Sequence, residues 1–285
     1  MKTKHLISIL CCFIPQIILA QQAELVLKGV EETRRIHYME KNKLELITEL
    51  SGIEVDDDHQ IRLKEINGID NLGNQLKSIG GYPYPNDYFT KQKKILIGIE
   101  SPIRKVHSIS VKGVIEYLTI SEELQSKISF INLQQHYHKN LLAGVSAKLK
   151  LVLIDLEGLG RLKEEDQAAY HKKVKEIHKK AGVRVSLEEA KEYLNSAVED
   201  YIYNKKVGQK TYLYFYNEDP DEELVEIKIF DNTGTETIQS AYSNHHTYSP
   251  SLEKLLTPKT QLQIIVKNKK AVKEIPFQLE SIELP

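Results

Sequence analysis

Apolar and polar residues alternate along most of the chain from Ala23 to Glu157, as they do in strands that place one face on a core. A first strand begins at residues 25–27, and residues 36–39 and 44–50, joined by the polar turn 40–43, predict a hairpin. Further strands are predicted at residues 60–66, 94–100, 107–119, 127–133 and 147–156. Because turn residues separate these runs, the pattern favours an antiparallel β-sandwich over a parallel sheet.

Residues 162–204 have a different pattern, because their apolar positions recur at helical intervals. One stripe consists of Tyr170, Val174, Ile177 and Ala181, and the other of Leu187, Ala190, Leu194, Ala197 or Val198, and Tyr201. Between them, Gly182 offers a helix stop, and Ser186 with Glu189 has the spacing of a capping box. The segment predicts an antiparallel helical hairpin that packs both stripes on one surface, most simply a sheet.

Alternation resumes after Gly208 and continues to the C-terminal end. Strands are predicted at residues 211–216, 224–230, 235–241, 261–266 and 271–279, with proline-containing loops at residues 219–220 and 249–250. These strands form a second sandwich, or they complete the first one with the helices as an insertion. We favour the first arrangement, with a signal peptide at 1–20, an N-terminal sandwich at 21–158, the helical hairpin at 159–206 and a C-terminal sandwich unit at 207–285.

Two of the predicted strands end in the same turn sequence, Asp-Asn-x-Gly, at residues 70–73 and 231–234. In such a turn we expect Asp to cap its own backbone and Gly to adopt the left-handed conformation. Strands that end in these turns resemble immunoglobulin-like modules in general architecture, although the Cys and Trp landmarks of antibody domains are absent. The resemblance implies an immunoglobulin-like, mainly β fold and no particular active residues.

The first twenty residues have the composition of a secretory signal. Lys2 and Lys4 precede the apolar run 6–20, which is interrupted by Pro15 and is shorter than the roughly 20 residues that a membrane-spanning helix needs. The small residue Ala20 marks the expected cleavage site. We therefore expect an exported protein, periplasmic, cell-surface or secreted, without a permanent membrane span.

The two cysteines of the sequence, Cys11 and Cys12, lie within the same segment. Lipidation there is disfavoured, because a small residue should precede the modified cysteine and Leu10 precedes Cys11. Cleavage would leave a mature chain without disulfides, thiolate metal sites or cysteine nucleophiles. It would also reduce the basic residues from 39 to 37 against 40 acidic ones, a formal charge of −3. This balance argues against a nucleic-acid partner.

Candidate metal and catalytic motifs are weak. The acidic run 56–58 followed by His59 lacks the ligand spacing of a calcium loop, so a solvated turn is the favoured interpretation. His136 and His138 would share one face of a strand, but no further ligand is apparent and we expect no metal or cofactor. The paired carboxylates of a glycosidase have no sequence signature. A secreted carboxylate-dependent hydrolase, acting for example on glycans in a cleft between the β units, is therefore the alternative function.

Tyrosine is the most suggestive residue type, with 15 copies and no Trp in the sequence. Tyr82, Tyr84, Asp87 and Tyr88 lie in a loop rich in Gly and Pro, where rigid aromatic rings would bind a protein or glycan partner. The competing and favoured interpretation is that these tyrosines close the end of a sandwich. Tyrosines 212, 214 and 216 alternate on one strand and are predicted to face the helices or the core. Together these features predict a non-enzymatic exported protein that binds a macromolecular partner or supports an envelope assembly.

Overall fold

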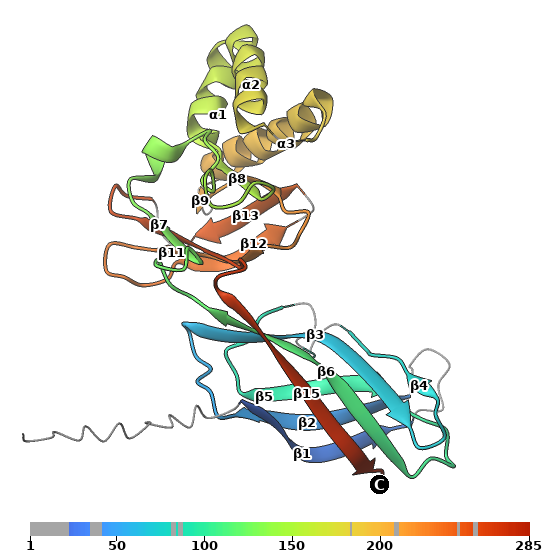
Figure 1. Ribbon diagram of the computed structural model, residues 1–285. Helices are drawn as coiled ribbons and strands as arrows, with labels where there is room; N and C mark the ends of the chain where they lie inside the picture. Colours follow the sequence, from blue (N-terminus) through green and yellow to red (C-terminus); the bar gives the residue numbers. More distant parts are fainter. Residues whose placement is uncertain are drawn as a thin grey trace, which may run out of the picture.

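The computed structural model of the protein describes residues 23–34, 42–80, 84, 88–182, 184–207, 211–243, 246–252 and 256–285. The predicted signal segment and residues 36–39 of the predicted hairpin lie outside these residues. Strands account for 44% of the structure and helices for 21%, so the expected mainly β class is confirmed. The described residues form four antiparallel sheets and three α-helices, arranged as two β units placed end to end (Figure 1).

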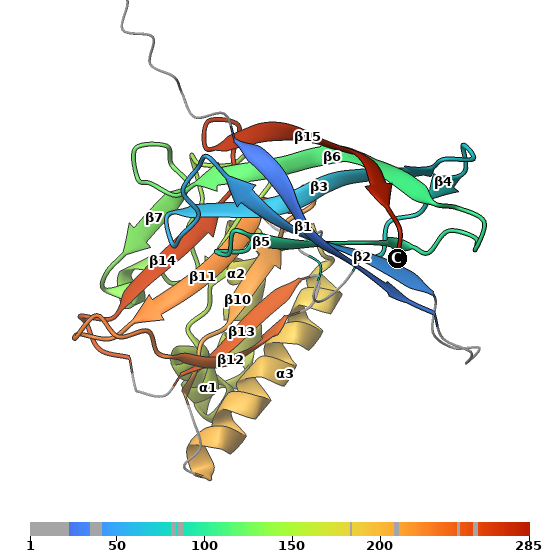
Figure 2. The ribbon, with the colours of Figure 1, turned by 90° about the horizontal axis from the view of Figure 1, so that it is seen from below.

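The first unit consists of two sheets that share one core. Its strands are β1 (Glu24–Thr33), β2 (Lys43–Ser51), β3 (His59–Asp70), β4 (Gln75–Leu76), β5 (Lys94–Glu100), β6 (Ser108–Thr119) and β15 (Val272–Glu283). One sheet has the order β1-β2-β5 and the other β15-β6-β3-β4, and Figure 2 shows β15, β6 and β3 side by side in one layer. Apolar side chains from both sheets, among them Leu46, Ile97 and Ile115, form the core between the layers.

Backbone hydrogen bonds join the two sheets of this unit at one corner. The Ile79 amide donates to the Gly98 carbonyl at 2.9 Å, and the Glu100 amide donates to the Lys77 carbonyl at 2.9 Å. The chain that follows β4 therefore pairs with β5 of the opposite sheet. The finer expectation of an immunoglobulin-like sandwich is not confirmed.

The second unit combines two further sheets with the helices. Its strands are β7 (Lys127–Phe130), β8 (Lys150–Leu153), β9 (Thr211–Tyr212), β10 (Phe215–Glu218), β11 (Leu224–Phe230), β12 (Ile238–Ser243), β13 (Thr247–Leu252) and β14 (Gln261–Val266). A short 3₁₀ helix, η1 (Leu133–His136), follows β7. One sheet has the order β12-β13-β10-β8, with β9 also paired to β13, and the other has the order β11-β14-β7. Their facing side chains form a second core around Leu151, Phe215 and Ile264.

Three helices, α1 (Leu156–Glu165), α2 (Gln167–Ala181) and α3 (Leu187–Lys206), cover the outer face of β8 and β10. Most residues of the predicted apolar stripes are buried in this layer, and Ser186 and Glu189 form the predicted capping box. Gly182 ends α2 in the left-handed conformation, as expected. None of the described helices is long and apolar enough to span a membrane. The expected hairpin of two helices over residues 162–204 is in fact a layer of three helices, and the first of them, α1, begins earlier, at Leu156.

Strand pairing does not follow the order of the chain. The last strand, β15, pairs with β6 of the first unit, whereas β7 and β8 belong to the sheets of the second unit. The connections after β6 and before β15 therefore run side by side between the units, and the Thr119 amide donates to the Ala271 carbonyl at 2.9 Å. The sheets thus mix strands from the segments 21–158 and 207–285, because register depends on pairing partners that are distant in sequence.

The predicted loop at Ser249-Pro250 is wrong, since both residues lie within strand β13. Proline is tolerated there because the neighbouring ladder is interrupted: β9 ends at Tyr212 and β10 begins at Phe215. The Pro250 carbonyl accepts from the Leu213 amide at 3.1 Å, and the Ser249 hydroxyl donates to the Leu213 carbonyl at 3.0 Å. A side-chain donor therefore supplements the ladder beside the proline.

Candidate functional site

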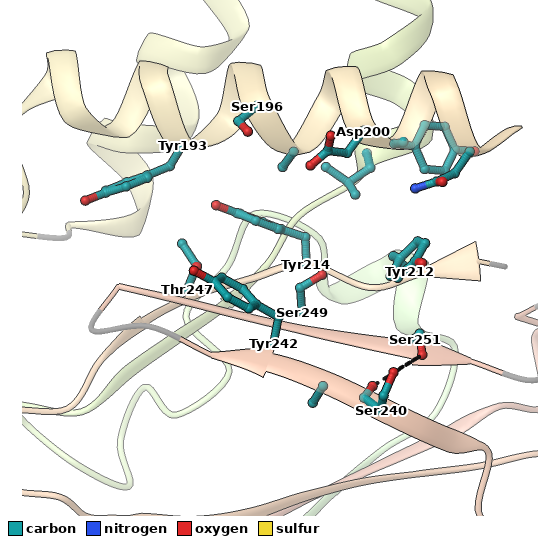
Figure 3. Close-up of a pocket in the computed structure, with 15 residues that line it drawn as sticks. Tyr193, Ser196, Asp200, Tyr212, Tyr214, Ser240, Tyr242, Thr247, Ser249 and Ser251 are labelled. Atoms are coloured by element: carbon teal, nitrogen blue, oxygen red, sulfur yellow. Dashed lines mark hydrogen bonds between the residues drawn. The ribbon is translucent and has the colours of Figure 1, made fainter. Parts of the chain in front are cut away.

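A groove of about 510 Å³ lies between helix α3 and the outer face of strands β12, β13 and β9 (Figure 3). The helices pack on β8 and β10 through Val152, Ile154 and Tyr216. The sheet also contains β13 and β12, which extend beyond the strands that the helices cover. The groove lies above this part of the sheet, and α3 lines its side. The groove is thus a consequence of three helices covering part of a wider sheet.

One wall of the groove is a single face of α3. Tyr193, Ser196, Asp200 and Asn204 follow one another at intervals of three or four residues, which places them in a row along the helix. At a rise of about 1.5 Å per residue, this row extends over about 16 Å. Figure 3 shows Tyr193, Ser196 and Asp200 on the side of the helix that faces the sheet.

The floor of the groove presents three tyrosines and a group of hydroxyl side chains. The tyrosines are Tyr212, Tyr214 and Tyr242, and the hydroxyl side chains are those of Ser240, Thr247, Ser249 and Ser251. The Ser240 and Ser251 hydroxyls lie 2.8 Å apart and bridge β12 and β13 (Figure 3). With Tyr193 and Tyr201 of α3, five tyrosines line one groove.

The groove tyrosines differ in exposure. Tyr214 is 7% exposed and forms a side-chain hydrogen bond with Thr247, whereas Tyr242 is 68% exposed. Burial raises the pKa of Tyr214 far above its usual range, and burial likewise raises the pKa of Tyr201. Both phenols therefore stay protonated at neutral pH and offer uncharged hydroxyl groups.

Asp200 is the single charged side chain among the described residues that line the groove. No Lys, Arg or His is part of the lining within the described chain. Cationic side chains such as these form the strongest hydrogen bonds to anionic ligands. The described lining therefore offers neutral hydroxyl groups and one carboxylate, and it has no cationic side chain that could pair with an anion.

Of the tyrosine loop singled out from the sequence, the structure describes Tyr84 and Tyr88. Tyr82 and Asp87 lie outside the described residues. Tyr84 is only 3% exposed; its hydroxyl donates to Glu45 Oε1 at 2.8 Å and its ring packs on Gly98 of β5. Tyr84 is therefore part of the core of the first unit and is not accessible to a ligand.

Tyr88, which is 38% exposed, lines a second cavity of about 520 Å³ between the two units. Two ion pairs cross it, Arg62 to Glu222 at 3.9 Å and Lys91 to Glu226 at 4.0 Å. A third acid, Asp219, accepts backbone N–H groups on both carboxylate oxygens, at 2.7 and 2.8 Å. These carboxylates already have partners within the protein, and their ion pairs connect the two units. The cavity is therefore a weak candidate for the acid–base chemistry of the alternative function, a carboxylate-dependent hydrolase.

The acidic run near the first unit is a self-capped turn. Asp56 Oδ1 accepts from the backbone amides of Asp58 and His59 at 2.9 and 2.8 Å, and it lies 2.9 Å from His59 Nδ1. Possible ligand atoms of Glu54, Asp56 and His59 lie within 4.8 Å of one another. Since the Asp56 oxygen already holds the turn, the solvated-turn interpretation accounts for the cluster.

The paired histidines do not lie on a strand. His136 ends η1, and His138 follows with a left-handed φ of 62°, so the predicted common strand face does not form. Burial lowers the pKa of His138, which favours the neutral imidazole. This arrangement provides no support for a histidine metal site.

Comparisons of the chain with protein-family models, curated proteins and solved structures found no match. The groove is therefore the feature from which a function can be inferred. The sequence contained two signals for it: the alternating tyrosines after Gly208, and the spacing of Tyr193, Ser196 and Asp200 on α3. Neither signal shows that the helix face and the sheet face lie opposite each other, because that relationship depends on tertiary packing.

Proposed function

We propose that the protein is an exported binding protein without catalytic activity, and that the groove between α3 and the β12-β13-β9 face holds a segment of a hydroxyl-rich glycan. The observation that carries this proposal is the lining itself: five tyrosines and five Ser or Thr hydroxyls, with no basic side chain among the described lining residues.

The chemistry of a glycan matches both parts of this lining. The C–H faces of sugar rings are weakly positive and pack on the electron-rich faces of aromatic rings. Sugar hydroxyls both donate and accept, as do the Ser, Thr and Tyr hydroxyls of the groove. Asp200 accepts hydrogen bonds, and Asn204 adds an amide that donates and accepts. The row along α3 is long enough for several sugar rings.

The position of the groove favours a glycan over an extended peptide. Peptides commonly bind sheets by adding a strand at a free edge. The groove lies on the face of the sheet, and β13 at its floor already pairs with β12 on one side and with β9 and β10 on the other. Recognition on this face therefore depends on side chains rather than on backbone pairing.

A single carboxylate among the described residues of the groove favours binding over hydrolysis. Glycoside hydrolysis ordinarily uses two carboxyl groups on opposite sides of the scissile bond. Among the described residues of the groove, Asp200 is the single carboxylate. One carboxylate suits a binding site that orients hydroxyl or amino groups of its ligand.

Export and architecture complete the proposal. The charged and apolar composition of residues 1–20 supports secretion with cleavage near Ala20, which would place the groove where extracellular or envelope glycans occur. The two antiparallel layers of the first unit support an immunoglobulin-like sandwich that serves as a scaffold. Strands β15 and β6 connect this unit to the second unit, which contains the groove.

The test is capture of the mature chain, beginning at Gln21, by an immobilised panel of neutral and amino oligosaccharides. We expect retention by part of the panel, and loss of about tenfold in affinity when Tyr212 and Tyr242 are both replaced by Ala. Tyr203→Ala is the matched control, since Tyr203 is 63% exposed on α3 and does not line the groove. The proposal fails if no oligosaccharide is retained, or if the double variant binds as the unmodified protein does while its thermal unfolding is unchanged.

A further inference from the structure

We infer that the groove prefers glycans that carry free amino groups, and that Asp200 is the residue that determines this preference. The inference rests on the proposed function and specifies its ligand class. It follows from the charge of the groove, from the pairing of the neighbouring cations and from the tyrosine faces around Asp200.

The Asp200 carboxylate is available to a ligand. It belongs to the exposed part of α3 and lines the groove, and Figure 3 shows it directed toward the space above Tyr214 and Ser249. Within the described part of the chain, it takes part in no hydrogen bond or ion pair. A carboxylate at a ligand site that has no cation of its own attracts one from the ligand.

Three lysines of the helical layer are engaged with other acids. Lys163 lies 2.6 Å from Glu199, which precedes Asp200 in the chain. Near the end of α3, Lys205 lies 3.6 Å from Glu157 and Lys206 lies 3.4 Å from Glu164. These last two lysines line a separate cavity between α1 and α3, on the other side of Tyr201. None of these three lysines forms an ion pair with Asp200.

The tyrosine rings favour a cation at the same place. An ammonium group is attracted to the negative face of an aromatic ring, and the attraction increases when water is partly excluded. Tyr201 already shows this behaviour on its outer side, where Lys205 Nζ lies 5.9 Å from the ring centroid. An amino sugar would place its ammonium group beside Asp200 and its ring face on a tyrosine. A single sugar residue of the ligand would therefore contact both the carboxylate and an aromatic ring.

The expected preference is modest, because Asp200 is exposed and solvent screens the pair. Exposed ion pairs correspond to an affinity difference of up to about fivefold. We therefore expect the unmodified protein to bind an oligomer of glucosamine about fivefold more tightly than the fully N-acetylated oligomer of equal length. The preference should decrease as salt is added, since salt screens exposed charges.

The experiment measures the affinity of both oligomers by calorimetry for the mature protein, for Asp200→Asn and for Glu192→Gln. The last variant is the matched control, because Glu192 is an exposed acid of α3 that does not line the groove. Asp200→Asn should abolish the preference and keep binding of the acetylated oligomer, and Glu192→Gln should keep the preference.

Other results would contradict either the role of Asp200 or the assignment of the groove to glycans. Equal binding of both oligomers by the unmodified protein, or a preference that survives in Asp200→Asn, overturns the role of Asp200 and leaves the proposed glycan groove standing. Failure of both oligomers and of the wider oligosaccharide panel overturns the proposed function itself. Binding of an oligolysine peptide with the same dependence on Asp200, without binding of either oligomer, would identify the groove as a site for basic peptides and would overturn the glycan assignment.

Discussion

The Tyr216 hydroxyl donates a hydrogen bond of 2.6 Å to the backbone carbonyl of Ala190. Tyr216 lies on β10 and Ala190 lies on α3, and both residues are buried. The bond therefore fixes the helix to the sheet beside the groove. Because α3 forms one wall of the groove and the sheet forms its floor, this single contact helps to set the distance between them.

Tyr216→Phe should lower the free energy of unfolding by about 1 kcal/mol, because it removes one buried hydrogen bond and keeps the ring. Burial raises the pKa of Tyr216 far above its usual range, so the hydroxyl is a donor at every pH used for such a measurement. Chemical denaturation measures the change. Tyr203→Phe is the control and should leave stability unchanged, since Tyr203 is largely exposed. Equal losses in the two variants would contradict the role given to the Ala190 contact.

Gly98→Ala should destabilise the protein by about 1–3 kcal/mol, because the new methyl group overpacks the core of the first unit. A Cβ at this position would lie 2.6 Å from the Tyr84 ring. That ring has little freedom to move, because its hydroxyl is bound to Glu45.

Gly29→Ala provides the comparison for this measurement. A Cβ at Gly29 would meet no heavy atom closer than 3.5 Å. The thermal unfolding of the Gly29→Ala variant should therefore match that of the unmodified protein. A Gly98→Ala variant as stable as Gly29→Ala would show that Tyr84 does not fill this space in solution.

Asp70 should make the stability of the first unit depend on pH in the acidic range. Burial, the largest single effect, raises its pKa, but hydrogen bonds from the Asn74 side chain and from the Asn74 and Leu72 amides together lower it below 3.8. A pKa that is lower in the folded state contributes stability above the unfolded value, and this stability is lost as the pH falls through the folded pKa. The midpoint of thermal unfolding should therefore fall less steeply below pH 3.8 in Asp70→Asn than in the unmodified protein.

Gly73→Ala separates this titration from the geometry of the turn. Gly73 has a φ of 88°, and a Cβ at this position would have nothing within 4 Å, so the substitution introduces backbone strain alone. It should lower stability by about 1 kcal/mol at every pH and leave the acidic slope unchanged. An identical slope in Asp70→Asn and Gly73→Ala would argue against the capping role of Asp70.

Features that depend on neighbours in sequence could be predicted from the sequence. Both Asp-Asn-x-Gly turns have the expected form: Asp70 and Asp231 accept backbone amides of their own turns, and Gly73 and Gly234 are left-handed. The capping box of α3 and the glycine stop of α2 are equally local. Each of these signals involves residues a few positions apart, so the chemistry of a short segment is sufficient to specify it.

The tertiary structure decided which distant segments meet. Alternation predicted a strand near β15, but pairing with β6 rather than with β14 depends on contacts across the whole chain. The burial of Tyr84 against Gly98 and the strand conformation of Pro250 depend in the same way on neighbours from other strands. The alternation of apolar and polar residues predicted a mainly β protein, and the helical intervals with their capping residues predicted two helices. The groove, with Asp200 opposite Tyr214 and Ser249, arises because α3 covers part of a wider sheet, and sequence periodicity contains no information about that fit.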